Sequence, residues 1–168
     1  GAGQIPAFEP GGLSEGGTAL LVRGGGGEIF LTGRSNGRTL IGRLAGGAWQ
    51  TLGEVIRPPG GGFVTLPIVN AIVHDGTALY IAGNFTHIND TPASGVARWD
   101  GTIWTSLGSG VRVADTEWFG QVYGVKDLAF VGGQLYAAGR FRAAGGVATF
   151  NLARWDPVRA EWNKVAGP

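Results

Sequence analysis

Several residue types are missing or scarce in this sequence, and each absence excludes a class of function. The 168-residue chain has no cysteine, which excludes disulfide bonds, thiol catalysis and thiolate metal sites. Its only histidines are His74 and His87, so few side chains suit metal binding or acid–base chemistry. Methionine is absent even at the start, and we expect a processed product or a piece of a longer protein. No apolar run approaches the length of a membrane span, which predicts no membrane insertion.

Net charge is also small. Thirteen Lys and Arg residues face twelve Asp and Glu residues, for a formal charge of +1. A nucleic-acid-binding surface needs a clustered basic patch, and no basic run is present. The sequence therefore predicts no nucleic-acid partner.

What the chain has in quantity is glycine, tryptophan and short apolar runs. Thirty-three glycines without a Gly-X-Y period, with 43% hydrophobic residues and six tryptophans, are typical of a turn-rich folded protein. No segment sustains helical spacing. Runs of four to eight residues rich in Val, Ile, Tyr, Phe and Trp, separated by Asp-Gly or Asn-Asp turns, predict strands at residues 69–74, 78–85, 95–100 and 103–107. We expect an all-β fold with four strands per module.

An internal repeat organises these strands. Residues 79–85 and 135–141 match at an offset of 56, and the same offset superposes Ala-Arg-Trp-Asp at 97–100 on 153–156. A more degenerate copy lies upstream, where residues 29–33 and 42–45 match and Trp49 corresponds to Trp104 and Trp162.

The repeat predicts three modules, at about 12–57, 58–112 and 113–168. Because 168 residues equal three lengths of 56, the ends fall in phase, and residues 1–11 correspond to the end of a preceding repeat.

The repeated tetrapeptide is interpreted as a packing unit. On an extended strand side chains alternate, so Ala97 and Trp99 share one face while Arg98 and Asp100 share the other. We expect Trp99 to fill the gap toward one neighbouring sheet and Arg98 to lie across the other face, with Trp104 anchoring the outer strand. The predicted structural residues are Arg43, Trp49, Arg98, Trp99, Asp100, Trp104, Arg154, Trp155, Asp156 and Trp162.

The predicted strand at residues 78–85 is apolar at nearly every position. Residues 78–85 do not alternate, so we expect this strand to be covered on both faces by stacked sheets. The Ala-Gly pairs at 82–83 and 138–139 indicate places where backbones approach closely.

Four-stranded repeats with periodic Gly and Trp are typical of β-propellers. The pattern LYxAGxF, a variable loop, then xxARWDGxxWxxLGxG resembles the repeats of large bacterial secreted proteins with kelch-like propellers and of the fungal cell-surface Rax2 family. The first copy departs from it at Leu44 and Ala45. The resemblance implies an extracellular or cell-surface propeller used for architecture or contact, without shared catalytic residues. A copper radical oxidase of kelch-like fold would need a cysteine cross-linked to tyrosine, which this chain lacks.

Three modules alone leave a physical difficulty, because propellers close with about four to eight blades. Two apolar faces would stay uncovered, an aggregation liability for a free monomer. The alternatives are a six-bladed ring of two copies, a stack or filament of copies, and further blades from a longer chain. A two-fold dimer is favoured because closed symmetry is the commonest assembly.

Candidate chemistry is sparse, and the sequence predicts no cofactor, no metal and no catalytic residue. His74 aligns with Phe130 and is interpreted as a half-buried filler. A weak cation site at His87, Asn89 and Asp90 competes with ordinary turn chemistry. The glycine tract 24–27 lacks the Lys-Ser/Thr of a phosphate-binding loop and aligns with the turn at 74–77. A glycosidase needs two positioned carboxylates. The acidic candidates do not recur in the repeat and have no recognisable site around them; they are Glu15, Glu28, Asp115, Glu117 and Asp127.

Aromatic residues in the connections between modules are candidates for partner contact. Phe63, Trp118 and Phe119 are not required by the repeat, and they suit stacking on sugar or docking of a protein. The alternative is that they plug the wedge between modules. We therefore predict a non-enzymatic structural or interaction module that associates with further copies or further chain, with a carbohydrate-binding propeller as the alternative and a glycoside hydrolase as a distant third.

Overall fold

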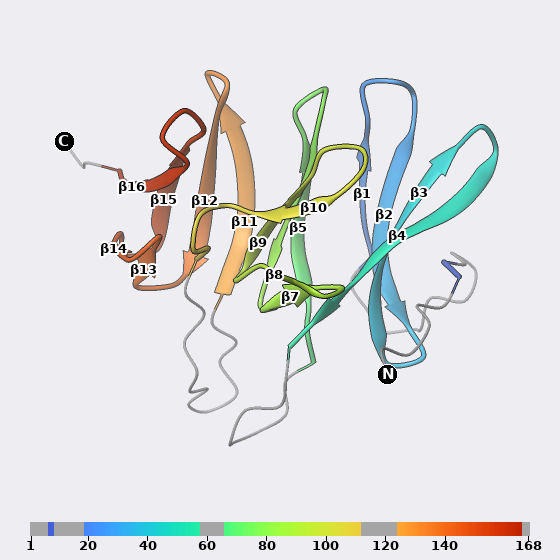
Figure 1. Cartoon of the computed structure of the whole chain (residues 1–168), viewed down its shortest axis with the longest axis horizontal. Coiled ribbons are helices and arrows are strands. Elements are labelled where there is room, and N and C mark those ends of the chain that lie inside the picture. Colours follow the sequence, from blue (N-terminus) through green and yellow to red (C-terminus); the bar gives the residue numbers. More distant parts are fainter. Residues whose placement is uncertain (1–6, 9–18, 58–65, 112–123, 166–168) are drawn as a thin grey trace.

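The computed structural model describes residues 7–8, 19–57, 66–111 and 124–165, and in this part of the chain every regular element is a β-strand. The strands form antiparallel sheets that stand side by side (Figure 1). Across these ranges there is no helix long and apolar enough to cross a membrane. The predicted all-β class is confirmed.

The first sheet contains a four-strand meander. It comprises β1 (Leu20–Arg23), β2 (Ile29–Ser35), β3 (Arg38–Ala45) and β4 (Ala48–Ile56), each paired with the next. Asn36 and Gly37 join β2 to β3 with φ of 49° and 78°, which is the backbone of a tight hairpin turn.

Two further sheets repeat this arrangement. The second consists of β5 (Val69–His74), β6 (Leu79–Gly83), β9 (Val96–Trp99) and β10 (Trp104–Ser106). The third consists of β11 (Gly124–Val131), β12 (Gln134–Arg140), β15 (Leu152–Asp156) and β16 (Glu161–Lys164). The four strands of the second sheet lie where the sequence predicts them, within two residues at each end.

Small hairpins interrupt the second and third repeats. The first is β7 (His87–Ile88) with β8 (Thr91–Pro92), and the second is β13 (Ala143–Ala144) with β14 (Val147–Ala148). Strand β7 pairs with β4, so the first sheet has six strands in the order β1-β2-β3-β4-β7-β8. Ala144 forms an equivalent bridge with Val111, just after β10. Each hairpin thus reaches back to the preceding repeat, whereas the tight β2–β3 turn gives the first repeat no such hairpin.

Strand register supports the sequence alignment of the three copies. The second-strand aromatic faces the repeat arginine in every sheet, and the third strand meets the closing tryptophan in every sheet. The pairs are Phe30 with Arg43, Tyr80 with Arg98, Tyr136 with Arg154, Leu44 with Trp49, Trp99 with Trp104, and Trp155 with Trp162.

The second strand of the middle repeat is covered on both faces, as expected. Every residue of β6 is buried. A Cβ at Gly83 would lie 1.9 Å from the Ile68 carbonyl oxygen, and one at Gly139 would lie 2.3 Å from the Gly124 carbonyl oxygen. The expected close approach of backbones occurs at both positions.

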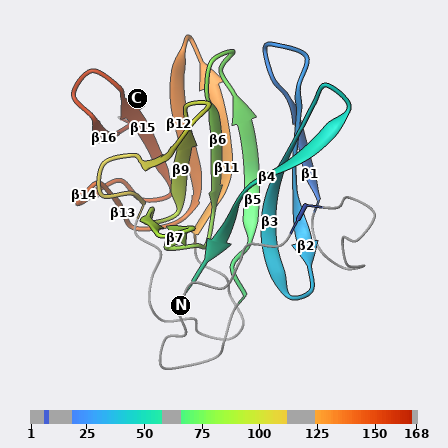
Figure 2. The same ribbon diagram turned by 45° about the vertical axis from the view of Figure 1, so that its right-hand side comes forward.

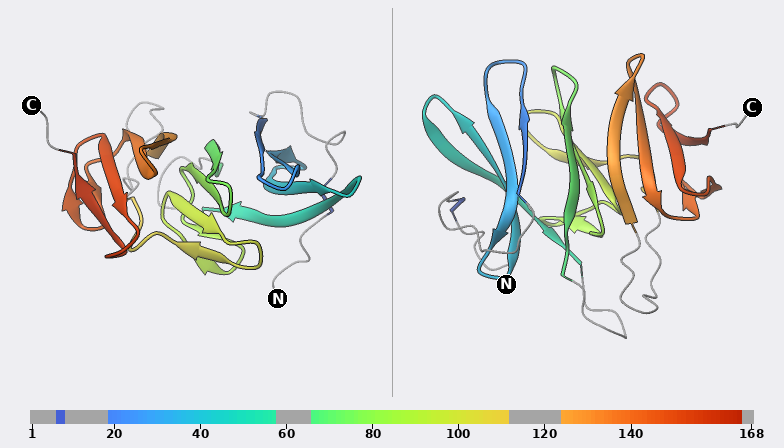
Figure 3. Two further views of the ribbon diagram at one scale, coloured as in Figure 1. Left: turned by 90° about the horizontal axis from the view of Figure 1, so that it is seen from above. Right: turned by 180° about the vertical axis from the view of Figure 1, so that it is seen from behind.

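The three sheets follow one another in chain order, as the view from above makes clear (Figure 3). Their first strands are neighbours, β1 beside β5 and β5 beside β11. The turned view of Figure 2 shows β5 next to β11. One apolar core lies between the first and second sheets and another between the second and third. Within the described ranges, the middle sheet is therefore covered by a neighbouring sheet on both faces, and each outer sheet is covered by a neighbouring sheet on one face.

Candidate interaction surfaces

At each junction between neighbouring sheets, a tryptophan of the later sheet forms a hydrogen bond to the backbone of the earlier repeat. Trp104 Nε1 on β10 donates a hydrogen bond to the Leu52 carbonyl of the first sheet at 3.0 Å. Trp162 Nε1 on β16 donates to the Leu107 carbonyl after β10 at 2.9 Å. Leu52 and Leu107 each lie three residues after the closing tryptophan of their own repeat, so the two bonds are the same contact made twice.

A second contact recurs closer to the first strands. The Phe30 ring on β2 stacks on the His74 ring of β5, with centroids 5.4 Å apart. The Tyr80 ring on β6 meets the Phe130 ring of β11 edge-on, with centroids 5.3 Å apart. In each case the second strand of one sheet contacts the first strand of the next. His74 packs as the half-buried filler that the sequence predicts, and its Nδ1 accepts a hydrogen bond from the Gly76 N–H.

The repeat tryptophan and arginine lie on opposite faces of β9. Trp99 packs with the core between the first and second sheets, 5.8 Å from the Phe30 ring. The Arg43 guanidinium lies 5.6 Å from the Trp99 centroid and pairs with Glu28 at 2.8 Å. This ion pair lowers the pKa of Glu28. On the other face of β9, the Arg98 guanidinium lies over Tyr80 of its own sheet.

Aspartates close the turns next to these residues. Asp75 and Asp100 begin identical Asp-Gly-Thr turns, and the Oδ1 of each accepts three hydrogen bonds from the two residues that follow the glycine. Those from Ile103 and Thr102 lower the pKa of Asp100 to about 2. Asp156 closes the longer β15–β16 turn in the same way, and a hydrogen bond from Arg159 lowers its pKa.

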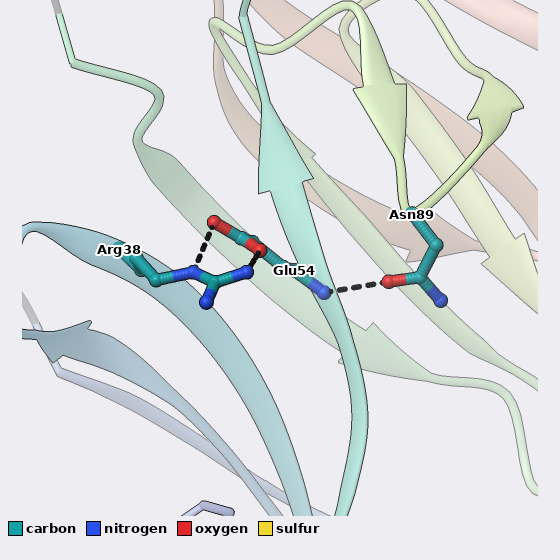
Figure 4. Close-up of polar contacts among 3 residues, drawn as sticks. All are labelled: Arg38, Glu54 and Asn89. Carbon is teal, nitrogen blue, oxygen red and sulfur yellow. Dashed lines mark hydrogen bonds and ion pairs between the residues drawn. The ribbon is translucent and has the colours of Figure 1, made fainter. Parts of the chain in front are cut away.

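The hairpin β7–β8 is fixed to the first sheet by a polar cluster (Figure 4). Arg38 on β3 forms a two-pronged ion pair with Glu54 on β4, and the Glu54 N–H donates to Asn89 Oδ1 at 2.9 Å. Asn89 has φ of 49°, and its tight turn joins β7 to β8. Its side-chain oxygen is thus committed to the backbone of the first sheet.

The contacts of His87 and Asn89 favour ordinary turn chemistry over the weak cation site that the sequence leaves as an alternative in this loop. His87 Nδ1 lies 2.9 Å from Thr86 Oγ1, while Asn89 is bonded to Glu54. In the described ranges no three His, Cys, Asp or Glu side chains are placed to hold a metal ion.

The other candidates fall into three groups. The glycine tract 24–27 lies in the β1–β2 turn, as expected. Glu28 pairs with Arg43, and Asp127 is exposed on β11, where its Oδ1 accepts a hydrogen bond from the Leu128 N–H. Glu15, Phe63, Asp115, Glu117, Trp118 and Phe119 lie outside the described residues.

The register corrects one detail of the alignment. Arg23, His74 and Phe130 face Ile29, Leu79 and Leu135 respectively, so Arg23 occupies the place of His74. The sequence alignment assigned that place to Gly24. The difference arises because the β1–β2 turn is closed by Gly24 and Glu28, and the shorter β5–β6 turn by Asp75 and Ala78.

The outer sheets carry apolar side chains on the faces that no other sheet covers. In the middle sheet Leu79 and Ile81 face the first sheet and are fully buried. Their counterparts Ile29 and Leu31 are only partly buried, and Leu21 beside them is 63% exposed. We call this face, with Leu21, Arg23, Ile29, Leu31, Leu44 and Trp49, the first-sheet flank.

The third sheet shows the mirror situation. Val96 and Tyr80 of the middle sheet are buried against the third sheet. Their counterparts are more exposed: Leu152, the counterpart of Val96, is 39% exposed, and Tyr136, the counterpart of Tyr80, is only partly buried. We call the face with Ala129, Val131, Tyr136, Ala138, Leu152 and Arg154 the third-sheet flank.

Phe8 covers a limited part of the first-sheet flank. Its ring packs on Trp49 at 5.1 Å and its N–H donates to Thr51 Oγ1 at 2.6 Å. A Cβ at Gly42 would lie 2.2 Å from Phe8 Cδ1, so the glycine makes room for the ring. Phe8 thereby gives Trp49 an aromatic neighbour, since Leu44 stands where the other sheets have Trp99 and Trp155.

Comparison with protein-family models finds no match, and neither does comparison with curated proteins.

Proposed function

We propose that this protein is a non-enzymatic structural or interaction module of the β-propeller type, in which the three sheets act as blades and association completes the fold. The observation that carries the proposal is the contrast between equivalent residues. Side chains that are buried in the middle sheet have more exposed counterparts on the first-sheet flank and the third-sheet flank. Apolar surface of this kind is stabilised by contact with a partner.

The side-by-side first strands also favour a propeller. In that architecture the first strand of every blade lines a central axis, and β1, β5 and β11 are neighbours in this way. The proposed extracellular or cell-surface setting rests on the resemblance of the repeat motif alone.

A non-enzymatic role is favoured by where the polar groups are used. Within the described ranges the repeat aspartates close turns, Glu28 and Glu54 pair with arginines, and His74 packs on a phenylalanine. The carbohydrate-binding and hydrolase alternatives depend in large part on residues outside those ranges.

Light scattering on the full chain during size-exclusion chromatography tests the proposal. We expect a mass that rises with protein concentration from one copy toward a defined assembly. A well-folded monomer at every concentration up to the millimolar range would contradict it. A glycan array run in parallel tests the carbohydrate-binding alternative, and strong binding there by the monomer would favour that alternative instead.

A further inference from the structure

The two internal junctions between sheets provide a template with two recurring contacts. In the first, the closing tryptophan of the later sheet donates to the carbonyl that lies three residues after the closing tryptophan of the earlier sheet. In the second, the second-strand aromatic of the earlier sheet packs on one first-strand residue of the later sheet. Any third junction built by the same repeat has to supply both contacts.

Both halves of a third junction are present in the chain, but on opposite flanks. On the third-sheet flank, Tyr136 stands where Phe30 and Tyr80 stand, and Val165 lies three residues after Trp162. On the first-sheet flank, Trp49 stands where Trp104 stands, and Arg23 occupies the place of His74. The middle sheet separates these two sets, as seen from above in Figure 3, so they do not meet within one copy.

The side chains concerned have the exposure that a missing partner would leave. Tyr136 is partly buried although Tyr80 and Phe30 are buried, and Arg23 is exposed. Trp49 is half-buried, and no described residue accepts a hydrogen bond from its Nε1, whereas the nitrogens of Trp104 and Trp162 are both bonded. An indole N–H usually has a partner when it is buried.

We infer that the third-sheet flank of one copy binds the first-sheet flank of a second copy in the register of the internal junctions, an inference that rests on the proposed function. Trp49 Nε1 of one copy donates to the Val165 carbonyl of the other, and the Arg23 guanidinium lies over the Tyr136 ring as a cation–π contact. Arginine is well suited to this position, because its planar group stacks on an aromatic face.

The number of copies follows from closure. Propellers contain about four to eight blades, so two copies of three sheets give six, whereas one copy gives too few and three copies too many. Two copies related by a two-fold axis form the junction twice and leave no flank uncovered. A second copy of this chain carries both complementary flanks, so we take it as the occupant of the two faces together.

The junction between copies lacks one contact that the internal junctions have, the backbone pairing of a small hairpin with the preceding repeat. Hairpins β7–β8 and β13–β14 reach back to the preceding repeat, and the first sheet has only the tight β2–β3 turn at this place. We therefore expect reversible association, with monomer and dimer in measurable exchange.

Cross-linking tests the register directly, because the chain has no native cysteine. Arg23→Cys and Tyr136→Cys are prepared separately, mixed, diluted, reconcentrated and treated with a short bismaleimide. We expect a covalent two-chain product from the mixture and little from either variant alone. The matched control is Ile103→Cys mixed with Tyr136→Cys, because Ile103 is 59% exposed but lies in the β9–β10 turn of the middle sheet. This control should give no product.

Each outcome is decisive. If Arg23→Cys cross-links to itself, the flanks meet in a like-to-like manner and the inference is wrong. If the chain assembles but the mixture gives no product, the inference fails while the proposed function stands. A folded monomer at all concentrations overturns both, and a mass that grows past two copies overturns the closed ring.

A second measurement does not depend on cross-linking. Arg23→Glu should raise the dimer dissociation constant about 10-fold or more, because a cation–π contact is lost at both junctions. Arg142→Glu reverses an exposed charge between β12 and β13 and should leave the constant unchanged. Equal effects of the two variants would contradict the assigned contact.

Discussion

At the scale of single residues, Trp162 does two things that can be separated. Its ring fills the core between the second and third sheets, and its Nε1 bonds the Leu107 carbonyl. Trp155 lies opposite on β15 and packs on the same ring at 5.3 Å, but within the described residues its own nitrogen has no acceptor. The two tryptophans therefore allow a comparison that bears on the bond between sheets, with Trp162 fully buried and Trp155 partly buried.

We predict that Trp162→Phe lowers the free energy of unfolding by about 1–3 kcal/mol more than Trp155→Phe does. Both changes remove similar volume, but the first also leaves a buried carbonyl without its donor. Urea unfolding of both variants at one protein concentration measures the difference. Equal losses would show that the bond between sheets contributes nothing beyond packing.

Gly42 is the residue that admits Phe8 to the first-sheet flank. The equivalent positions in the other sheets are alanine, at Ala97 and Ala153. We predict that Gly42→Ala displaces the Phe8 ring and costs about 1–3 kcal/mol, a typical penalty for overpacking. The 19F resonance of Trp49 in protein labelled with 5-fluorotryptophan reports the loss of the ring contact and keeps all six tryptophans in place. The control Ala97→Gly should leave this signal unchanged.

At the scale of elements, the Asp-Gly-Thr turn of residues 100–102 links stability to pH. The pKa of Asp100 is about 2 in the folded chain, below the value of about 3.9 for an unfolded chain. A depressed folded-state pKa contributes stability above the unfolded pKa, and that stability disappears as pH falls through the folded pKa. The contribution of Asp100 should therefore be complete above about pH 4 and be lost between pH 4 and pH 2.

Asp100→Asn checks this expectation, because the amide keeps an acceptor oxygen but cannot titrate. We predict that the difference in urea midpoint between the wild type and the variant is constant from pH 7 to pH 5 and shrinks toward pH 2. In Thr102→Val, the loss of urea midpoint between pH 5 and pH 2 should be smaller than in the wild type, since this change removes the hydroxyl that donates to Asp100. A difference that is unchanged at pH 2 would contradict the assignment.

Elements also show what sequence could predict. The strands of the second repeat were predicted from the sequence, and so was the equivalence of Phe30, Tyr80 and Tyr136. The register agrees with that equivalence, since all three residues pair with the repeat arginines. The hairpins β7–β8 and β13–β14 did not, because two-residue strands carry no alternation. The shift from Gly24 to Arg23 was missed since a run of glycines does not mark where a turn begins.

The contacts between sheets were the least predictable from sequence. Alternation on β9 correctly separates the faces of Trp99 and Arg98. The acceptors of Trp104 and Trp162 are backbone carbonyls, however, and a carbonyl is common to all residues. Only the stacking of one sheet on the next identifies which carbonyl is in reach.

At the scale of the whole molecule, the two flanks determine whether the proposed assembly forms. Leu21 is the most exposed apolar residue of the first-sheet flank, and its counterparts Ile72 and Leu128 contact the preceding sheet at the internal junctions. Full burial of a leucine side chain contributes about 1.5–3 kcal/mol. In a ring of two copies Leu21 is buried twice, so its replacement affects two junctions.

We predict that Leu21→Lys raises the dimer dissociation constant by more than about 100-fold, since two buried leucines are worth about 3 kcal/mol or more. The fold of one copy should persist, because Leu21 is 63% exposed there and a lysine at this place stays in water. Ile103→Lys is the matched control, with similar exposure but a position in the β9–β10 turn, away from both flanks. Sedimentation equilibrium measures both constants, and circular dichroism checks the fold. If the two lysine variants associate equally well, apolar contact at the first-sheet flank does not hold the copies together.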